Sequence, residues 1–371
     1  MLDLSKGFSF GINIDDPWRY AGISGPKSII IPHLLSVSLP EGRAVERIDK
    51  EILSKHGHNE PKTSAEKASL SLAENLQKIG IDFIRCWFPW RFFESEAYPE
   101  KDLESLYNNS YSKWPMDTFL ETLSNHGVSV IPVLACGYQR MLPRRLSVDA
   151  NRDLYIRRAS VHVSLLVRRY RKFVKFWQIE NEPNWWQMHG AGGWRKGVSW
   201  LDPHGFRLKL LKGLSEAVHN EDPGSTTIIN LESDSANSIL DEARVCSQIA
   251  DVIGLDYYPN YRSAAPINTA VIRNANEVAN SIGRSVLIME TGYPSAPRIL
   301  GYSESGQTEY IKSACRTAHG LDHVSGIGIW RYMDSSWRSF PDQENHFGLI
   351  DKSGKPKTAW NAFADEINSL K

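Results

Sequence analysis

The sequence has few cysteines, no long apolar run and no export signal. Four cysteines lie far apart in 371 residues and form no C-x-x-C pair, which argues against a zinc knuckle or a redox pair. We expect them to be buried free thiols, as in a reducing compartment. No apolar run reaches 18 residues, which excludes a membrane-spanning helix. The first residues lack a basic segment followed by an apolar one, so a cytoplasmic location is expected.

A net charge of either sign is also missing, because 43 Lys and Arg are balanced by 43 Asp and Glu. Such a chain has no overall field that would attract nucleic acid or an anionic membrane, and we expect neither as a partner. Aromatic residues are plentiful, with 12 Trp and 14 Tyr. Their flat faces suit sugar rings, although they also fill protein cores.

Short apolar runs rich in β-branched residues alternate with longer segments of helical periodicity. The expected strands are residues 8–14, 81–87, 128–135, 175–180, 225–231, 251–258, 285–291 and 326–332. The expected helices are residues 64–80, 115–126, 153–172, 203–221, 236–249, 267–282, 305–319 and 358–370. Eight such units predict an α/β protein, a (β/α)8 TIM barrel with residues 1–371 as a single domain. A doubly wound open sheet competes, but the Gly-rich phosphate loop that usually follows its first strand is missing.

Two segments near the N-terminus carry further predictions. Residues 15–63 separate the first strand from its helix by far more than a usual loop, which predicts an insertion over the barrel mouth. Its HGH triplet, His56 and His58, resembles a metal site, but no third ligand is evident and no metal is expected. In the helix over 64–80, we expect an apolar face formed by four side chains. These are Leu70, Leu72, Leu76 and Ile79.

The chemistry of a (β/α)8 barrel lies at the C-terminal ends of its strands. The fourth strand ends in WQIENEPNWW, which places Glu182 at its tip, and the seventh ends in LIMETGYPS, which places Glu290 at a second tip. Strands four and seven face one another across the mouth. Two carboxyl groups about 5 to 5.5 Å apart cleave a glycosidic bond with retention of configuration. The simpler alternative is that each glutamate caps or pairs with an arginine at the barrel rim.

The segments NEP and ETGYP resemble the signatures of clan A, the large clan of retaining (β/α)8 glycoside hydrolases, and some motifs resemble endo-galactanases and β-xylosidase-like members. The resemblance implies that Glu182 is the acid/base and Glu290 the nucleophile. It also implies that Asn181 hydrogen-bonds the 2-hydroxyl of the sugar. Such a mechanism requires no metal or organic cofactor.

Other strands carry further matches to the clan. IRCWFPWRFFE resembles the strand-two motif whose arginine, here Arg85, supports the nucleophile. DVIGLDYYP resembles the strand-six motif of endo-galactanases, which implies that Tyr258, with Tyr257 as the alternative, donates a hydrogen bond to the nucleophile. GIGIWRYMDSSW resembles the segment whose tryptophan, here Trp330, floors the subsite of the cleaved sugar.

Two more tryptophans and one departure complete the expected site. Trp90, at the end of FPW, and Trp185, in the aromatic cluster after strand four, are expected to bind or support the substrate. Asp256 lies two positions before Tyr258, where several families of the clan carry His, Asn or Ser. The pattern of this chain therefore differs from that of any single family in the clan.

The predicted function is hydrolysis of β-glycosidic bonds in oligo- or polysaccharides by double displacement, with a carbohydrate as the partner. A transglycosylase using the same two glutamates remains open, as does a carbohydrate-binding barrel without turnover. An aldolase or a metal-dependent hydrolase is disfavoured, because the sequence has no lysine at a strand end for a Schiff base and no histidine cluster.

Overall fold

The computed structural model describes residues 7–14, 61–94, 115–137, 151–184, 204–233, 239–335 and 342–371, together with a few single positions between them. All eight predicted strands lie within these ranges. Most of the segment 15–63 lies outside them, so its proposed position over the mouth stays a prediction.

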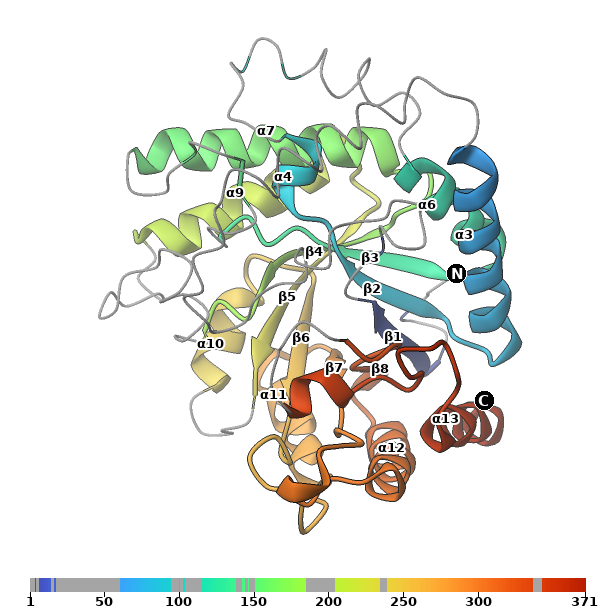
Figure 1. Ribbon diagram of the computed structural model, residues 1–371. Helices are drawn as coiled ribbons and strands as arrows, with labels where there is room; N and C mark the ends of the chain where they lie inside the picture. The colour runs from blue at the N-terminus through green and yellow to red at the C-terminus, as the bar shows by residue number, and fades with distance from the viewer. Residues whose placement is uncertain are drawn as a thin grey trace.

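Eight parallel strands form a closed barrel in sequence order, and β8 pairs with β1 to close it (Figure 1). The strands are β1 (Ser9–Ile14), β2 (Phe83–Trp87), β3 (Ser129–Val133), β4 (Phe176–Asn181), β5 (Thr226–Glu232), β6 (Val252–Tyr257), β7 (Val286–Thr291) and β8 (Val324–Ile329). Each strand is buried along nearly its whole length, as expected for a parallel sheet covered by helices. The predicted (β/α)8 fold is confirmed.

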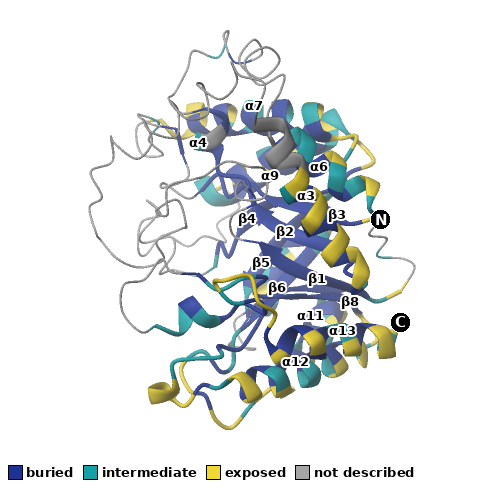
Figure 2. Cartoon of the chain, turned by 45° about the vertical axis from the view of Figure 1, so that its right-hand side comes forward, coloured by how far each residue is buried: buried dark blue, intermediate teal, exposed yellow. Residues whose placement is uncertain are grey.

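Helices surround the barrel and present their exposed sides to solvent (Figure 2). They are α3 (Pro61–Lys78), α4 (Trp90–Phe93), α6 (Pro115–Asn125), α7 (Arg152–Tyr170), α9 (Phe206–Glu221), α10 (Ile239–Cys246), α11 (Asn274–Ile282), α12 (Glu304–His319) and α13 (Thr358–Leu370). Short 3-10 turns lie at Ala270–Arg273, Arg298–Leu300 and Gln343–His346. Within the part of the chain that the structure describes, no helix combines the length and apolarity needed to cross a membrane.

The barrel interior is layered, because alternate residues of a strand point to the same face. Phe83 and Phe176 belong to a small apolar cluster, and two residues further along the same strands lie Arg85 and Gln178, both buried. The apolar layer is tightly packed at Gly11, where an added Cβ would overlap the Phe83 ring. The polar layer therefore lies above it, toward the C-terminal ends of the strands.

A larger apolar cluster fills the space between the strands and the helices. From the segment of α3 it takes Leu72, Leu76 and Ile79. The prediction that Leu70 shares this face was wrong, since its side chain is 40% exposed. Two helical positions correspond to a turn of about 200°, so Leu70 lies on nearly the opposite side of the helix from Leu72.

All four cysteines are free and buried, as predicted. Cys86 lies on β2, Cys136 just after β3, Cys246 at the end of α10 and Cys315 within α12. Burial raises the pKa of each thiol above its ordinary value. The thiols are therefore protonated and shielded in the folded protein.

Candidate active site

Polar side chains interrupt the apolar strands at the C-terminal end of the barrel. All of them are at least nine-tenths buried, and they come from six different strands. They are Asn13, Arg85, Gln178, Asn181, Asn230, Asp256 and Glu290. Because buried polar groups need partners, so many in one layer indicate a connected network.

Arg85 on β2 is the centre of this network. Its Nη1 lies 2.5 Å from Glu290 Oε1 and donates to Asn13 Oδ1 at 2.8 Å. Its Nε donates to Gln178 Oε1 and its Nη2 to Asn181 Oδ1, both at 2.5 Å. A guanidinium has a rigid, planar set of donors, so these contacts fix the Glu290 carboxylate relative to the tip of β4.

Tyr258 provides a second donor to Glu290. Its hydroxyl donates to Glu290 Oε2 at 2.6 Å, and its ring packs edge-on against Phe347. Burial and then the charge of Glu290 raise the pKa of Tyr258 well above its ordinary value, so the hydroxyl keeps the proton that it donates. The alternative residue, Tyr257, belongs to the outer apolar cluster. Of the two tyrosines, Tyr258 is the one that contacts Glu290.

Glu182 lies immediately beyond β4 in a left-handed backbone conformation, with φ +41°. A non-glycine residue in that region costs of order 1 to 3 kcal/mol and persists only where its surroundings hold it. Here the Glu182 N–H donates to the carbonyl oxygen of Asn230 at 3.0 Å, and Asn181 Nδ2 lies 3.4 Å from Glu182 Oε2. Backbone strain of this kind concentrates at functional sites.

The electrostatic setting of Glu182 differs from that of Glu290. Burial, followed by the negative charges of Glu290 and Glu232, raises the pKa of Glu182 well above its ordinary value, and Arg85 lowers it only in part. Glu182 is 7% exposed, so little solvent screens these charges. A carboxyl group in this setting keeps its proton to a higher pH than an ordinary glutamate and is suited to donate it.

Sequence reasoning missed the amides that connect the two sides of the mouth. Gln178 Nε2 donates to Asn230 Oδ1, and Asn230 Nδ2 donates to Asp256 Oδ2, both at 2.5 Å. Asn13 Nδ2 donates to the carbonyl oxygen of Met289 at 2.9 Å. The sequence did contain a signal for these amides, because each is a single polar residue within an otherwise apolar strand. Gln178 stands in WQI, Asn230 in INL and Asn13 in INI.

Trp330 directly follows β8 and is 7% exposed. Its backbone N–H donates to the carbonyl oxygen of Thr291 at 2.8 Å, which places it beside the end of β7 that carries Glu290. The guanidinium of Arg331 lies 5.6 Å from the Trp330 ring. The structure therefore brings Trp330 to the mouth, and its role as a subsite floor stays a prediction.

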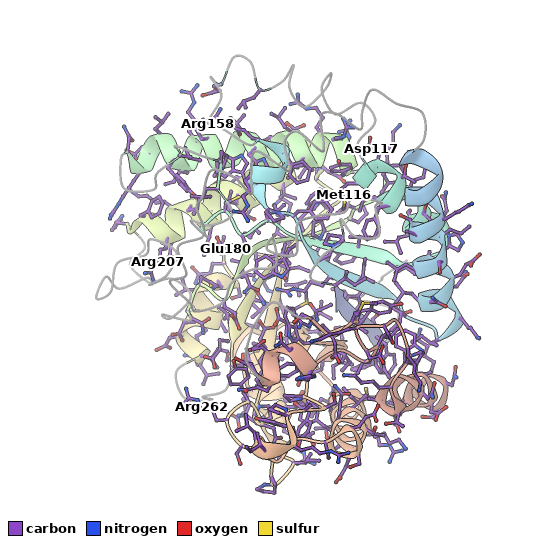
Figure 3. The ribbon with its side chains drawn as sticks, viewed as in Figure 1. Met116, Asp117, Arg158, Glu180, Arg207 and Arg262 are labelled. Carbon is purple, nitrogen blue, oxygen red and sulfur yellow. The ribbon has the colours of Figure 1, made fainter. Side chains whose placement is uncertain are left out.

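Trp90 packs against the helix α7. It begins the short helix α4, is fully buried, stacks on His162 of α7 at 4.7 Å and donates from Nε1 to Glu94 at 2.9 Å. Arg158, labelled on α7 in Figure 3, forms an ion pair with the same Glu94. This surrounding places Trp90 in the packing between α4 and α7, and its role in binding or supporting the substrate stays a prediction.

Trp185, His56 and His58 lie outside the described residues. Within the described ranges, no group of three His, Cys, Asp or Glu side chains has the arrangement of a metal site.

Comparison with known proteins gives short matches to two curated enzymes, and no family model matches the chain. An arabinogalactan endo-β-1,4-galactanase of Humicola insolens is 26% identical over 98 residues, 24% of this chain and 28% of that protein. Arabinogalactan endo-β-1,4-galactanase A of Emericella nidulans is 29% identical over 112 residues, 27% of this chain and 31% of that protein. The matches thus span under a third of each relative.

Solved structures with the same fold are similar over most of the chain. A GH5_18 protein from Streptomyces cattleya in complex with GlcNAc has a TM-score of 0.67 at 13% identity, covering 98% of this chain and 80% of that one. A family 39 glycoside hydrolase from Bacteroides cellulosilyticus has a TM-score of 0.59 at 15% identity, covering 100% and 65%. These neighbours are clan A barrels, in agreement with the resemblance of the sequence motifs.

Proposed function

We propose that this chain is a retaining glycoside hydrolase that cleaves β-glycosidic bonds, with Glu290 as nucleophile and Glu182 as general acid and base. The unequal setting of the two glutamates in one buried polar mouth carries the proposal. Arg85 and Tyr258 hold Glu290, whereas burial and neighbouring carboxylates raise the pKa of Glu182. Retaining hydrolysis requires this combination of an oriented carboxylate and a carboxyl group that keeps its proton.

The reaction proceeds in two displacements. A Glu290 oxygen attacks the anomeric carbon while the bond to the leaving oxygen breaks, and Glu182 transfers its proton to that oxygen. Glu182, now ionised, takes a proton from water, whose oxygen attacks the same carbon and releases Glu290. Each step inverts the carbon, so the product keeps the β configuration.

Uncharged β-linked saccharides are the proposed substrate class. The curated relatives are named as endo-β-1,4-galactanases, and the GH5_18 neighbour was crystallised with GlcNAc, an uncharged sugar. The equal numbers of basic and acidic residues in this chain agree with a neutral ligand. The mechanism uses side chains alone and needs no metal or organic cofactor.

A panel of aryl β-glycosides and β-linked oligosaccharides tests the reaction. We expect turnover with the β product formed first, observed by NMR. The rate should fall by at least about 10²- to 10⁴-fold in Glu290→Ala, and in Glu182→Ala on oligosaccharides, whose leaving groups need a proton. Glu216→Gln is the matched control, because Glu216 is exposed on α9, and it should leave the rate unchanged. Activity in Glu290→Ala equal to wild type, an α product formed first, or no turnover of any substrate would contradict the proposal.

Added azide separates the two roles. In Glu290→Ala, azide can enter from the face that the carboxylate vacates and displace an activated leaving group, which gives the α-glycosyl azide. In Glu182→Ala, azide replaces water in the second displacement and gives the β-glycosyl azide. The opposite pairing of variant and product would reverse the assigned roles.

A further inference from the structure

Asp256 is a third carboxylic acid beside the two proposed catalytic glutamates. It lies on β6, has no exposed surface, and pairs in register with Glu232 of β5 and Glu290 of β7. The pairing of β6 with β7 shifts register between Leu255 and Asp256. Asp256 therefore belongs to the polar layer of the barrel mouth and has no access to bulk water.

The two oxygens of Asp256 have different partners. Oδ2 accepts a hydrogen bond from Asn230 Nδ2 at 2.5 Å. Oδ1 is buried, and no hydrogen-bond donor within the described part of the chain reaches it. The carboxyl of Glu182 acts on the Asp256 carboxyl both by its charge and as a side-chain hydrogen-bond partner. Two ionised carboxylates cannot form such a bond, because both groups would be acceptors, so one of them must carry a proton.

The charges around the pair favour a proton on Asp256. The groups that act on it are Glu182, Glu290, Arg85 and Tyr258, and Glu232 acts on Glu182. Arg85 is the positive charge among them, and it is already in contact with Glu290. Burial, then the charges of Glu290 and Glu182, raise the pKa of Asp256 well above its ordinary value. An ionised Asp256 would be a further buried negative charge without its own cation, which is costly.

We infer that Asp256 is a positioning residue that stays protonated and donates a hydrogen bond from Oδ1 to the carboxyl of Glu182. This inference rests on the proposed role of Glu182 as acid and base. When Glu182 gives its proton to the leaving oxygen, the hydrogen bond stabilises the carboxylate that forms. Glu182 thereby becomes a stronger acid than its burial alone would allow. Asp256 keeps its own proton through both displacements.

An asparagine at this position would present the same hydrogen-bonding groups as a protonated aspartic acid. Its carbonyl oxygen can accept from Asn230 Nδ2, and its amide NH2 can donate to Glu182. Asp256→Asn is therefore the conservative variant, and it should behave like wild type only if Asp256 is neutral. Asp256→Leu has the same branching and number of side-chain heavy atoms but no donor, so it removes the hydrogen bond to Glu182.

The pH dependence of kcat/KM on an unactivated β-glycoside distinguishes these states, because its basic limb reports the Glu182 proton. For Asp256→Asn we expect activity within about 2-fold of wild type and an unchanged basic limb. For Asp256→Leu we expect a loss of about 10- to 100-fold, with the basic limb about one unit higher, since the Glu182 anion has lost a charge-assisted hydrogen bond. A basic limb that moves to lower pH in Asp256→Asn would show that Asp256 is ionised and would overturn the inference.

Infrared difference spectroscopy tests the proton directly and needs no turnover. At about pH 8, well above the ordinary pKa of aspartate, the wild-type spectrum minus that of Asp256→Asn should contain the C=O stretch of a protonated carboxylic acid. A difference containing only carboxylate bands would refute the protonated state, even if Asp256→Leu fails to fold. A protonated band together with no glycosidase activity would keep the assignment of the Asp256 proton and reject the proposed function instead.

Discussion

At the scale of single residues, Glu180 and Glu182 lie two positions apart but have different surroundings. Glu180 Oε2 accepts from the N–H of Gly137 at 2.7 Å and its Oε1 from the N–H of Asn181 at 3.0 Å, so its carboxyl joins the end of β3 to the end of β4 (Figure 3). Burial raises the pKa of Glu180 to about 7, although both backbone hydrogen bonds oppose the shift. The proposed mechanism does not use Glu180.

We expect Glu180 to make stability depend on pH. Because the pKa of Glu180 in the folded state lies above its ordinary value, its contribution is fully present at low pH and is lost as pH rises through about 7. Glu180→Gln does not titrate. The difference in unfolding free energy, wild type minus variant, should therefore fall by on the order of 3 kcal/mol between about pH 5 and about pH 8. Urea unfolding of both proteins measures this, and a difference independent of pH would contradict it.

Tyr258→Phe tests the hydroxyl that contacts Glu290. Losing a hydrogen bond to a charged group costs about 1.5 to 3 kcal/mol, so kcat/KM on a β-glycoside should fall by about 10- to 100-fold. Tyr257→Phe is the matched control, because Tyr257 is the last residue of β6, directly before Tyr258, but packs in the outer apolar cluster. Equal losses in the two variants would mean that packing of β6, and not the hydroxyl, is responsible.

The sequence identified the charged members of the site better than its amides. Arg85 and Glu290 were found because each stands in a motif at a strand end. The partners of Gln178 and Asn230 follow from how neighbouring strands are paired, and the sequence of one strand does not contain that register. The contact of Trp90 with His162 of α7 joins two segments far apart in the chain, and no local sequence pattern contains it.

At the scale of elements, the strand periodicity predicted all eight strands within a few residues, because parallel barrel strands are continuous apolar runs. One predicted helix boundary was wrong because a local side-chain hydrogen bond changes the backbone there. The segment 267–282 was predicted as one helix, but Asn268 Oδ1 accepts from the N–H of Ala270, and a 3-10 turn precedes α11. Such a side-chain bond offers the backbone an alternative to the helix.

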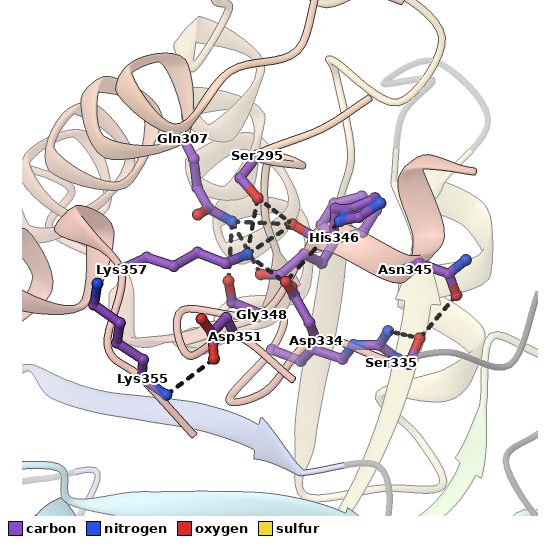
Figure 4. A network of polar contacts seen from close by, with 12 residues as sticks. Ser295, Gln307, Asp334, Ser335, Asn345, His346, Gly348, Asp351, Lys355 and Lys357 are labelled. Carbon is purple, nitrogen blue, oxygen red and sulfur yellow. Dashed lines mark hydrogen bonds and ion pairs between the residues drawn. The ribbon is translucent and has the colours of Figure 1, made fainter. Parts of the chain in front are cut away.

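The segment between β8 and α13 is fixed by a buried ion pair (Figure 4). Lys357 Nζ lies 2.7 Å from Asp334 Oδ1, and both side chains are at most 8% exposed. The ammonium also donates to Ser295 Oγ at 2.8 Å. These contacts of Lys357, directly before α13, thus join the segment after β8 to the segment after β7.

Lys357→Met should destabilise the protein by about 3 to 5 kcal/mol, because it leaves the carboxylate of Asp334 buried without its partner. Urea unfolding near neutral pH measures the loss. Lys212→Met is the control: Lys212 lies 3.9 Å from Glu216 on the surface of α9, with both side chains more than 60% exposed. Such a pair contributes at most about 1 kcal/mol. A similar small effect for both variants would show that Asp334 finds another partner or water.

At the scale of the whole molecule, the first strand and the last helix meet at the closure of the barrel. β1 pairs with β8, and α13 packs beside this pairing (Figure 1). Phe363 of α13 contacts Phe10 of β1 edge-on at 6.2 Å, and Lys371 donates to the carbonyl oxygen of Gly80 at 2.8 Å. The first strand and the last helix therefore depend on each other.

Phe363→Ala should cost about 3 to 5 kcal/mol, since it removes a fully buried ring from this contact. If residues 1–371 form a single domain, as the sequence predicts, circular dichroism and tryptophan fluorescence should report one shared transition that moves to lower denaturant. Phe363→Leu, which retains most of the apolar volume, should lose less. Two separate transitions in the Phe363→Ala variant would show instead that α13 detaches before the barrel unfolds.

The four buried thiols provide a way to time the opening of the barrel. A thiol reacts with an alkylating reagent only when it is exposed and ionised, and these four lie on β2, after β3, and on α10 and α12. Mass spectrometry of partially alkylated protein therefore gives a separate alkylation rate for each of the four cysteines. Equal rates would mean that the molecule opens as one unit, and a faster rate at one cysteine would identify the part of the wall that opens first.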